Sequence, residues 1–346
     1  MKFCILKNED PKSHIEWEKA CVKMKCDYSI VDLTSLRWFD EATSDNYDCY
    51  LLKPPGRTLV FKKMYDERVF VLSKLLDKIT YPSYEEILIH ENKKMLSYWL
   101  KSVKLPFIKT KVFYDSKETM DFLHSTKYPI VVKTSLGGSG SGVKFLKDIE
   151  TAKKYTKEAF TSGIRRSTGP GLRQGSYFKR ALNWLVHPEI AVEKIRGYIT
   201  DMEEYQKGFI LVQEYIPHDF EWRGVKIGNS YFAHKKMKVG EMCSGSKGIT
   251  YVNPPQKLFD FIKYVCEIGN FNGMSIDMLE DENGNYLINE LQTIFGHIQD
   301  HILEVDGKAG RYIFQNNKWV FEEGNFNSNL SFDLRLQNVL ELLNKK

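Results

Sequence analysis

Two acidic residues near the end of the chain could bind a metal ion together. Asp277 lies in the apolar run SIDML and Glu290 in LINEL, and the intervening Asn283-Gly284 favours a two-residue hairpin turn. Such a turn places Asp277 opposite Glu290, with Gln292 one step along the same face. Facing carboxylates about 5 Å apart repel each other. A bound Mg²⁺ would compensate, since it takes carboxylate oxygens and leaves positions for water and phosphate. The alternative is a solvent-exposed acidic hairpin.

The stretch YPIVVKTSLGGSGSGVKFLK, residues 128–147, could bind phosphate. It predicts a strand with Lys133, a glycine–serine loop and a second short strand. Glycine allows backbone N–H groups to approach an anion closely. The stretch has no GK[ST] and no helix directly after the glycines, which excludes a P-loop and a dinucleotide fingerprint. A flexible surface hairpin is the alternative.

A second tight turn, at Gly228-Asn229, predicts another hairpin with a polar face. Its members are two facing pairs and one further lysine: Arg223 with His234, Glu221 with Lys236, and Lys238. This face offers cations for phosphate oxygens and a carboxylate for a ribose hydroxyl. Salt-bridged surface strands would produce the same pattern.

Hydrophobic periodicity predicts the elements that position these residues. We expect strands at 2–6, 28–33, 47–52, 109–114, 209–213, 222–228, 230–238, 274–279, 286–291 and 319–321. We expect helices from a capping box at Ser13 and Glu16 to about Cys26, and at 62–77, 93–101, 116–124, 149–160, 177–185, from 199, 258–268 and 333–343. A second capping box is expected at Ser83 and Glu86, and an N-cap at Asp148.

This order predicts an α/β (α+β) protein in three parts. Residues 1–80 form a small parallel β-α-β domain, residues 81–210 a lobe with the glycine loop, and residues 211–346 a lobe with both polar hairpins. The segment 161–207 is locally basic. This segment is either a surface that binds an acidic substrate or a solvated helical insertion. Its basic residues favour an acidic substrate, such as an amino acid, a peptide or a sugar acid.

Composition excludes several classes of protein. The chain has 346 residues and a net charge of +5, which is too small to indicate nucleic acid as a partner. The six cysteines lack a CxxC pair, so we expect free thiols in a reducing compartment. The N-terminus is not typical of a signal peptide, and no apolar run approaches a membrane span. We expect a cytoplasmic protein without a membrane partner; whether it forms a homodimer is open.

The motifs together resemble the ATP-grasp superfamily over about residues 80–300. The resemblance rests on PIVVKTSLGGSGSGV, LVQEYI and SIDML…LINELQ, and on a lysine, Lys93, about a dozen positions before a Leu-Pro. It implies an ATP-grasp fold, in which two α+β lobes grip ATP, preceded by the small N-terminal domain of residues 1–80.

The resemblance also implies roles for particular residues. Those that would bind ATP are Lys93, Lys133, Gly137, Gly138, Ser139, Gly140, Gln213, Glu214, Ile216, Glu221 and Lys238. Asp277 and Glu290 match the acidic ligands of two Mg²⁺ ions, while Gln292 stands where the family usually has Asn. Arg223, Lys133 and Lys236 would act on the transferred phosphoryl or acyl group.

Most members of this superfamily join a carboxylate to an amine through an acyl phosphate. The first hypothesis is therefore an ATP-dependent carboxylate–amine ligase. An ATP-grasp kinase that phosphorylates a hydroxyl, and a nucleotide-binding regulatory protein without turnover, are the alternatives. The identity of both substrates is open.

Overall fold

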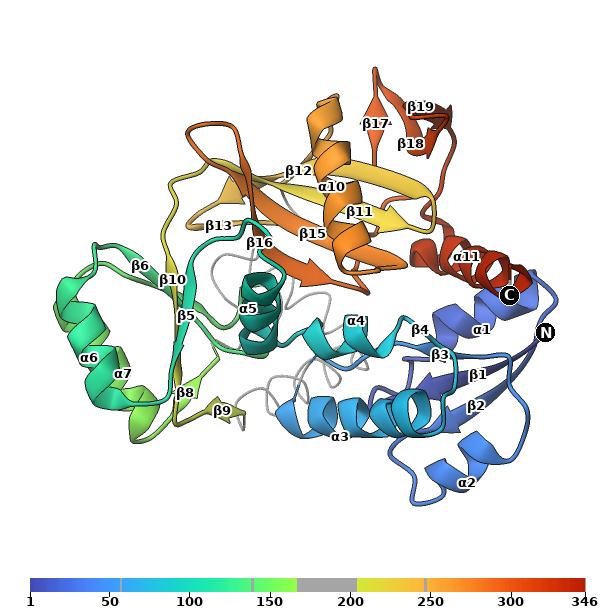
Figure 1. Cartoon of the computed structure of the whole chain (residues 1–346), viewed down its shortest axis with the longest axis horizontal. Helices are drawn as coiled ribbons and strands as arrows, with labels where there is room; N and C mark the ends of the chain where they lie inside the picture. The colour runs from blue at the N-terminus through green and yellow to red at the C-terminus, as the bar shows by residue number, and fades with distance from the viewer. Residues whose placement is uncertain (57, 138–139, 167–203, 246–247, 346) are drawn as a thin grey trace, which may run out of the picture. The chain divides into compact units, whose positions relative to one another are not determined.

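The computed structural model describes residues 1–346 except 57, 138–139, 167–203, 246–247 and 346. The chain divides into two compact units, each treated by itself below (Figure 1). Unit 1 comprises Met1–Pro55, Val60–Phe107 and Ile216–Lys346, and unit 2 comprises Gly56–Leu59 and Ile108–Tyr215.

Unit 1 begins with a four-stranded parallel sheet in the order β2-β1-β3-β4. Its strands are β1 (Lys2–Lys7), β2 (Asp27–Asp32), β3 (Cys49–Leu52) and β4 (Thr80–Tyr81). The connecting helices are α1 (Ile15–Lys23), α2 (Trp38–Thr43) and α3 (Leu59–Phe70), which continues into a π-helical turn, η1 (Val71–Leu75).

Both faces of this sheet are apolar, as expected for a parallel sheet covered on both sides. Phe3 and Ile5 of β1 pack with α1 and the C-terminal helix α11 (Phe332–Asn344). Cys4 and Leu6, which point the other way, pack with α2 and α3. The last helix of the chain therefore completes the core on one face of the parallel sheet.

The second sheet of unit 1 carries both polar hairpins, and its main path runs β16-β15-β11-β12-β18-β17. Its strands are β11 (Phe220–Ile227), β12 (Ser230–Val239), β13 (Met242–Cys243), β14 (Ile249–Thr250), β15 (Gly273–Glu280), β16 (Tyr286–Gln292), β17 (Glu304–Val305), β18 (Lys308–Gln315) and β19 (Lys318–Glu323). The helical elements around it are α4 (Tyr84–Ile89), α5 (Lys93–Ser102), α10 (Gln256–Ile268) and a 3-10 turn, η3 (Ser328–Ser331). Apolar residues of α5 and α10 pack into the core of this sheet.

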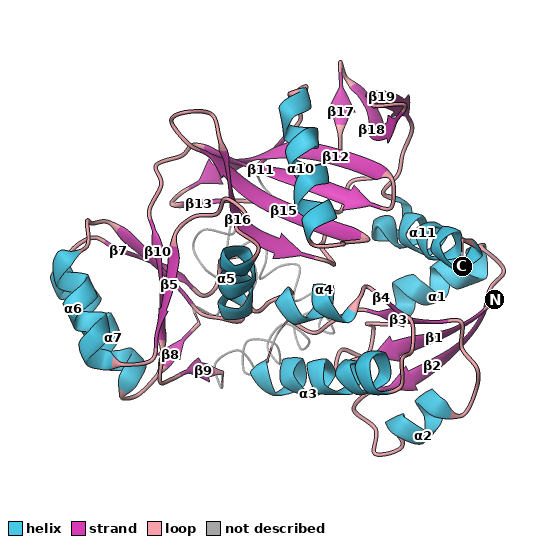
Figure 2. Cartoon of the chain, viewed as in Figure 1, coloured by secondary structure: helices cyan, strands magenta, loops and turns pink. Residues whose placement is uncertain are grey.

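Unit 2 contains an antiparallel sheet in the order β5-β10-β6-β7. Its strands are β5 (Thr110–Phe113), β6 (Ile130–Lys133), β7 (Val143–Leu146) and β10 (Ile210–Glu214), beside a small pair of β8 (Ile164–Arg165) and β9 (Tyr205–Gln206). The helices α6 (Ser116–Ser125) and α7 (Ile149–Phe160) lie together next to the sheet (Figure 2). Their apolar residues pack against alternate residues of the strands, including Ile130 and Val132 of β6.

Most of the predicted elements are confirmed to within a few residues, and one expected helix cap needs correction. The capping box at Ser83 and Glu86 is present, and Asp148 caps α7. The capping box expected at Ser13 and Glu16 is wrong. Helix α1 begins without a side-chain cap, and the Ser13 hydroxyl accepts a hydrogen bond from the backbone N–H of Asn8. The strands β17 and β18 were not expected. The helical patterns at 177–185 and from 199 fall largely or wholly outside the described residues.

Two further expectations concern thiols and membranes. All six cysteines are free, as predicted. Of the helices within the described ranges, none has the length and hydropathy that a membrane span requires.

Candidate active site

The polar hairpin β11–β12 has the predicted register. Arg223 lies opposite His234, and Glu221 lies opposite Lys236, across the Gly228-Asn229 turn. On its other side β11 pairs with β15, so that Arg223 also lies opposite Asp277. The hairpin is not a salt-bridged surface strand pair, because Glu221, Arg223 and Lys236 are each at most 8% exposed.

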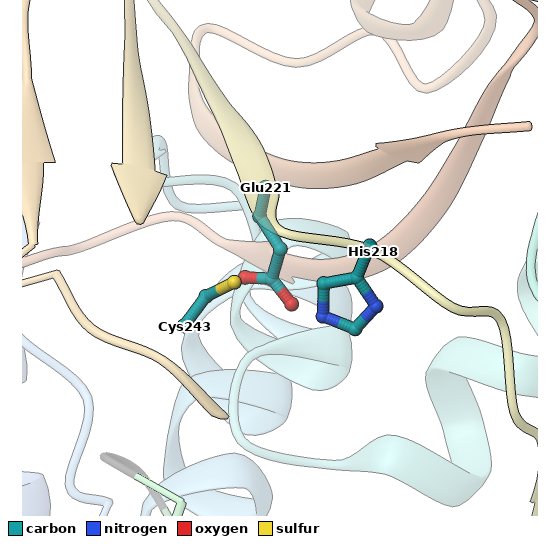
Figure 3. Close-up of side chains that lie close together, drawn as sticks. All are labelled: His218, Glu221 and Cys243. Atoms are coloured by element: carbon teal, nitrogen blue, oxygen red, sulfur yellow. The ribbon is translucent and has the colours of Figure 1, made fainter. Parts of the chain in front are cut away.

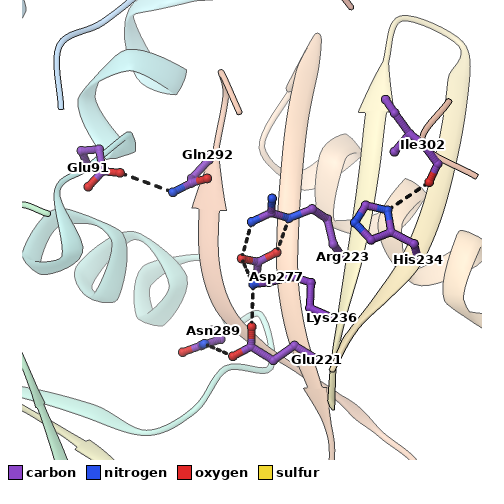
Figure 4. A network of polar contacts seen from close by, with 9 residues as sticks. All are labelled: Glu91, Glu221, Arg223, His234, Lys236, Asp277, Asn289, Gln292 and Ile302. Atoms are coloured by element: carbon purple, nitrogen blue, oxygen red, sulfur yellow. Dashed lines mark hydrogen bonds and ion pairs between the residues drawn. The ribbon is translucent and has the colours of Figure 1, made fainter. Parts of the chain in front are cut away.

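These side chains form a buried network of ion pairs (Figure 4). Arg223 donates from Nε to Asp277 Oδ1 and from Nη2 to Oδ2, each at 2.8 Å. Lys236 Nζ donates to Asp277 Oδ2 and to Glu221 Oε2, each at 2.7 Å. Asn289 Nδ2 donates to the other Glu221 oxygen at 2.9 Å. Asp277 therefore binds two cations at once, and Lys236 bridges the two carboxylates.

Electrostatics keep the network charged in spite of its burial. Burial alone would raise the pKa of Asp277, but Arg223 and Lys236 outweigh it and hold the pKa well below its usual range. Burial opposes the charged form of Lys236 as well, yet Asp277 and Glu221 raise its pKa. Burial and the neighbouring His297 and Arg223 lower the pKa of His234 to about 3, so this imidazole is neutral.

The second hairpin places Asp277 opposite Glu290 and Ser275 opposite Gln292, as predicted. The turn, however, is not the two-residue turn at Asn283-Gly284. The strands end at Glu280 and Tyr286, and the intervening residues 281–285 form the loop. The longer loop shifts the register by one residue, and a bulge between Asp277 and Met278 shifts it back. The pairing is right because two deviations cancel.

Glu290 and Gln292 lie beside the start of α5. Lys93 Nζ is 3.3 Å from Glu290 Oε1 and 3.7 Å from Glu91 Oε2. Gln292 Nε2 donates to Glu91 Oε1 at 3.3 Å, which leaves the amide oxygen as an acceptor. Within unit 1, Lys93 thus contacts one of the three predicted metal ligands, Glu290.

The predicted metal ligands offer a donor set that fits Mg²⁺. Asp277, Glu290 and Gln292 present carboxylate and amide oxygens, which Mg²⁺ prefers. Asp277 Oδ2 accepts two hydrogen bonds, while Oδ1 accepts one from Arg223 and keeps a lone pair. Among the described residues, the ion pairs around these ligands join four carboxylates, Glu91, Glu221, Asp277 and Glu290, to three cations, Lys93, Arg223 and Lys236.

In unit 2, Lys133 and Gln213 share one face of the sheet. Lys133 lies opposite Leu211 of β10, and Gln213 lies opposite Val131 of β6. Because side chains alternate along a strand, both point away from the face that packs on α6 and α7. Lys133 is 8% exposed and Gln213 is 7% exposed. This face therefore carries a buried cation next to a buried amide.

The loop between β6 and β7 depends on two of its glycines. Gly140 has φ +73°, a conformation that other residues adopt at a cost. A Cβ at Gly142 would lie 1.8 Å from the Thr134 hydroxyl oxygen, so this position excludes a side chain. Gly137 also has a positive φ. Gly138 and Ser139, two of the predicted nucleotide contacts, lie outside the described residues.

The remaining predicted nucleotide residues lie after β10 and on β12. Glu214 is the last residue of β10 and is exposed, and its backbone N–H donates to Lys109 O at 2.9 Å. The Ile216 carbonyl is 2.6 Å from His218 Nδ1. Lys238 lies near the end of β12, and its backbone N–H donates to Asp219 O at 2.9 Å.

Several residues of this region were not predicted from the sequence. Asn289 contacts Glu221 from the bulged strand, and Glu91 contacts both Lys93 and Gln292. His297 lies with its ring centroid 5.0 Å from that of His234. Asn289 is the neighbour of Glu290 in LINEL, which was the only hint of its role in the sequence. In a regular strand its side chain would point to the face of the sheet opposite to that of Glu290.

Comparison with known proteins agrees with the fold. Residues 92–171 match the family described as Carbamoyl-phosphate synthase L chain, ATP binding domain. No curated protein sequence matches the chain at a significant level.

Three solved structures illustrate the similarity. The RimK domain protein ATP-grasp from Sphaerobacter thermophilus DSM 20745 has a TM-score of 0.55 and 14% identity, over 84% of this chain and 90% of that one. The D-cycloserine synthetase DcsG has a TM-score of 0.56 and 11% identity, over 99% and 100%. D-alanine–D-alanine ligase from Bacillus anthracis has a TM-score of 0.53 and 12% identity, over 100% and 99%. The predicted fold class is confirmed: this chain has the ATP-grasp fold that these structures share.

Proposed function

We propose that this protein is an ATP-dependent ligase that joins a carboxylate to an amine through an acyl phosphate. The observation that carries the proposal is the buried network of Arg223, Lys236, Asp277 and Glu221 on an ATP-grasp sheet. Two of the similar structures are named as a ligase and a synthetase, which supports the same class of reaction.

Each unit carries residues to which the ATP-grasp resemblance assigns nucleotide contacts. In unit 2 these are Lys133, Gln213 and the glycine loop, and in unit 1 they are Lys93, Glu221 and Lys238. A loose phosphoryl-transfer transition state requires positioned positive charge more than covalent groups. Lysines fixed by burial or by ion pairs supply that charge without reorganisation.

Asp277, Glu290 and Gln292 would bind Mg²⁺ together with ATP. Since the carboxylates around them outnumber the cations, a polyphosphate would meet net negative charge. Mg²⁺ would supply the positive charge that lets the phosphates approach and that neutralises the transferred group.

The reaction would proceed in two steps. A carboxylate oxygen of the first substrate attacks the γ-phosphorus and ADP leaves, which gives an acyl phosphate. The amine nitrogen of the second substrate then attacks the acyl carbon, and phosphate leaves with the former carboxylate oxygen. Arg223 has one nitrogen, Nη1, that takes no part in its pair with Asp277 and could stabilise the developing oxyanion.

The test is a screen for phosphate release with ATP and Mg²⁺. Amino acids, dipeptides and sugar acids are each combined with a panel of amines. We expect free phosphate in amounts that depend on the presence of both an acid and an amine. ADP without free phosphate, together with a phosphorylated alcohol, would show the kinase instead. Nucleotide binding without ADP formation for any pair would support the regulatory protein.

A variant and a matched control make the screen specific. Arg223→Lys retains the charge but loses the second nitrogen, so we expect turnover to fall by about 100-fold. Arg311→Lys makes the same change in β18, where Arg311 pairs with Glu322 at the surface of unit 1. It should leave turnover within about twofold of the wild type. Equal losses in both variants would contradict the role of Arg223.

A further inference from the structure

Three side chains of different chemistry meet at one edge of the β11–β12 hairpin. His218 lies just before β11, Glu221 lies in β11 and Cys243 lies in the short strand β13. One nitrogen, one carboxylate oxygen and one sulfur from these residues lie within 4.8 Å of one another (Figure 3). The proposed ligase reaction uses neither His218 nor Cys243.

The histidine is oriented like a metal ligand. His218 Nδ1 is 2.6 Å from the Ile216 carbonyl oxygen, which can only accept, so Nδ1 carries the proton. Nε2 then has a free lone pair, and Figure 3 shows the other side of the ring turned toward Glu221. Metal-binding histidines usually donate their second N–H to a backbone carbonyl or a carboxylate in this way.

The Glu221 carboxylate is fixed by hydrogen bonds that leave room for an ion, and Cys243 is positioned by strand pairing. Each Glu221 oxygen accepts one hydrogen bond, from Asn289 and from Lys236, so each keeps a lone pair. Cys243 pairs with Lys238 across β12 and β13, which places its sulfur near Glu221. All three ligand atoms are therefore held in place before any ion binds.

An open, acidic hollow adjoins His218. It has a volume of about 340 Å³, and its other walls include Asp219, Glu280, Asp281 and Glu282. Four carboxylates around one hollow attract cations from solution. The hollow gives an ion and its remaining water ligands a way to reach the imidazole.

We propose that His218, Glu221 and Cys243 form a site for a thiophilic divalent cation of the Zn²⁺ class. One nitrogen, one oxygen and one sulfur suit Zn²⁺, with water as a fourth ligand, and do not suit Mg²⁺. Binding requires the thiolate, so Cys243 releases one proton to solvent as its sulfur binds the ion. Lys236 and Lys238 lie close by and reduce the affinity, which makes the site reversible rather than structural.

The site has a consequence for nucleotide binding. Glu221 is also the residue that we propose for the ribose hydroxyls, so the cation and the nucleotide would compete for one carboxylate. This consequence rests on the proposed function, whereas binding of the cation does not. The two are therefore measured separately.

The test uses Co²⁺ and Zn²⁺ with the full-length protein. We expect one Co²⁺ to give a sulfur-to-cobalt charge-transfer band, and Zn²⁺ to displace it. Calorimetry of Zn²⁺ in two buffers should report one proton released. Cys243→Ser should abolish the band, and His218→Gln should weaken Zn²⁺ binding by at least about tenfold. The matched control, Cys26→Ser, changes another half-buried thiol and should leave both unchanged.

Circular dichroism confirms that each variant is folded. If Cys243→Ser does not fold, the Zn²⁺ affinity of His218→Gln alone decides whether the site exists. Absence of a charge-transfer band in the wild type, or Zn²⁺ affinity unchanged in the folded variants, would overturn the proposal. Competition is a separate arm: Zn²⁺ should weaken ATP binding in the wild type and not in Cys243→Ser. If Zn²⁺ binds as expected but leaves ATP binding unchanged, the site stands and the role of Glu221 at the ribose is wrong.

Discussion

The substitution Asp277→Asn tests the buried network most simply. It retains the shape of the side chain and removes one negative charge between Arg223 and Lys236, which are 8% and 6% exposed. Lys236 would then keep its ion pair with Glu221, while Arg223 would lose the carboxylate to which it donates two hydrogen bonds. Removing one partner of a buried ion pair typically costs about 3–5 kcal/mol. We expect a loss of this size in the free energy of unfolding.

The assay is equilibrium unfolding in urea, followed by tryptophan fluorescence, because Trp222 lies on β11 next to Arg223. The chain has two units, so the transitions are fitted separately. Glu282→Gln is the matched control: it removes a carboxylate from the exposed loop after β15 and should change stability by less than about 0.5 kcal/mol.

The pH dependence has a definite sign. Because the folded pKa of Asp277 is lowered, its contribution is fully present above about pH 3.9, where the unfolded side chain ionises. The difference between wild type and variant should therefore be constant from pH 5 to 8 and shrink in stronger acid. A loss below about 1 kcal/mol at pH 7, or one that adds fully to the loss in Arg223→Met in a double-mutant cycle, would refute the reasoning.

Three further predictions concern the metal, the glycine loop and a buried histidine. Removing Mg²⁺ with EDTA should abolish ATP binding in calorimetry, because the polyphosphate would otherwise face excess carboxylates; unchanged affinity would contradict the metal site. Gly142→Ala should lower ATP affinity, since its Cβ would overlap the Thr134 hydroxyl, whereas Gly296→Ala, which meets no atom within 4 Å, should not. His234→Gln should reduce the stability lost between pH 8 and pH 5 by about 2 kcal/mol, since the folded imidazole, with its pKa lowered to about 3, stays neutral while the unfolded one takes up a proton below about 6.5. An identical pH slope in urea unfolding would contradict the neutral histidine.

The short-range patterns of the sequence were sufficient for the central strands. Gly228-Asn229 set the register of β11 and β12, and with it the pairing of Glu221 with Lys236. The pairing of Asp277 with Glu290 was predicted from a turn that does not form, and the bulge that restores it has no signal in a regular alternation of side chains. The cations that pair with Asp277 and Glu290 could not be foreseen.

Contacts between distant segments account for most of what was missed. The contact of Gln292 with Glu91 joins residues 201 positions apart, and Arg223 and Asp277 are separated by 54. The sequence indicated that two carboxylates faced each other and needed compensation, but not that buried arginine and lysine provide much of it. The cluster of His218, Glu221 and Cys243 depends on the short strand β13, which is not among the strands expected from the sequence.

The fate of the carboxylate oxygen tests the ligase most directly. With a substrate pair from the phosphate-release screen, the carboxylate is labelled with ¹⁸O and the released phosphate is analysed by mass spectrometry. An acyl-phosphate route predicts that one labelled oxygen appears in each phosphate, and that the product keeps the other. Phosphate without label would contradict the proposed route, because the bond between the carboxylate and phosphorus would never have formed.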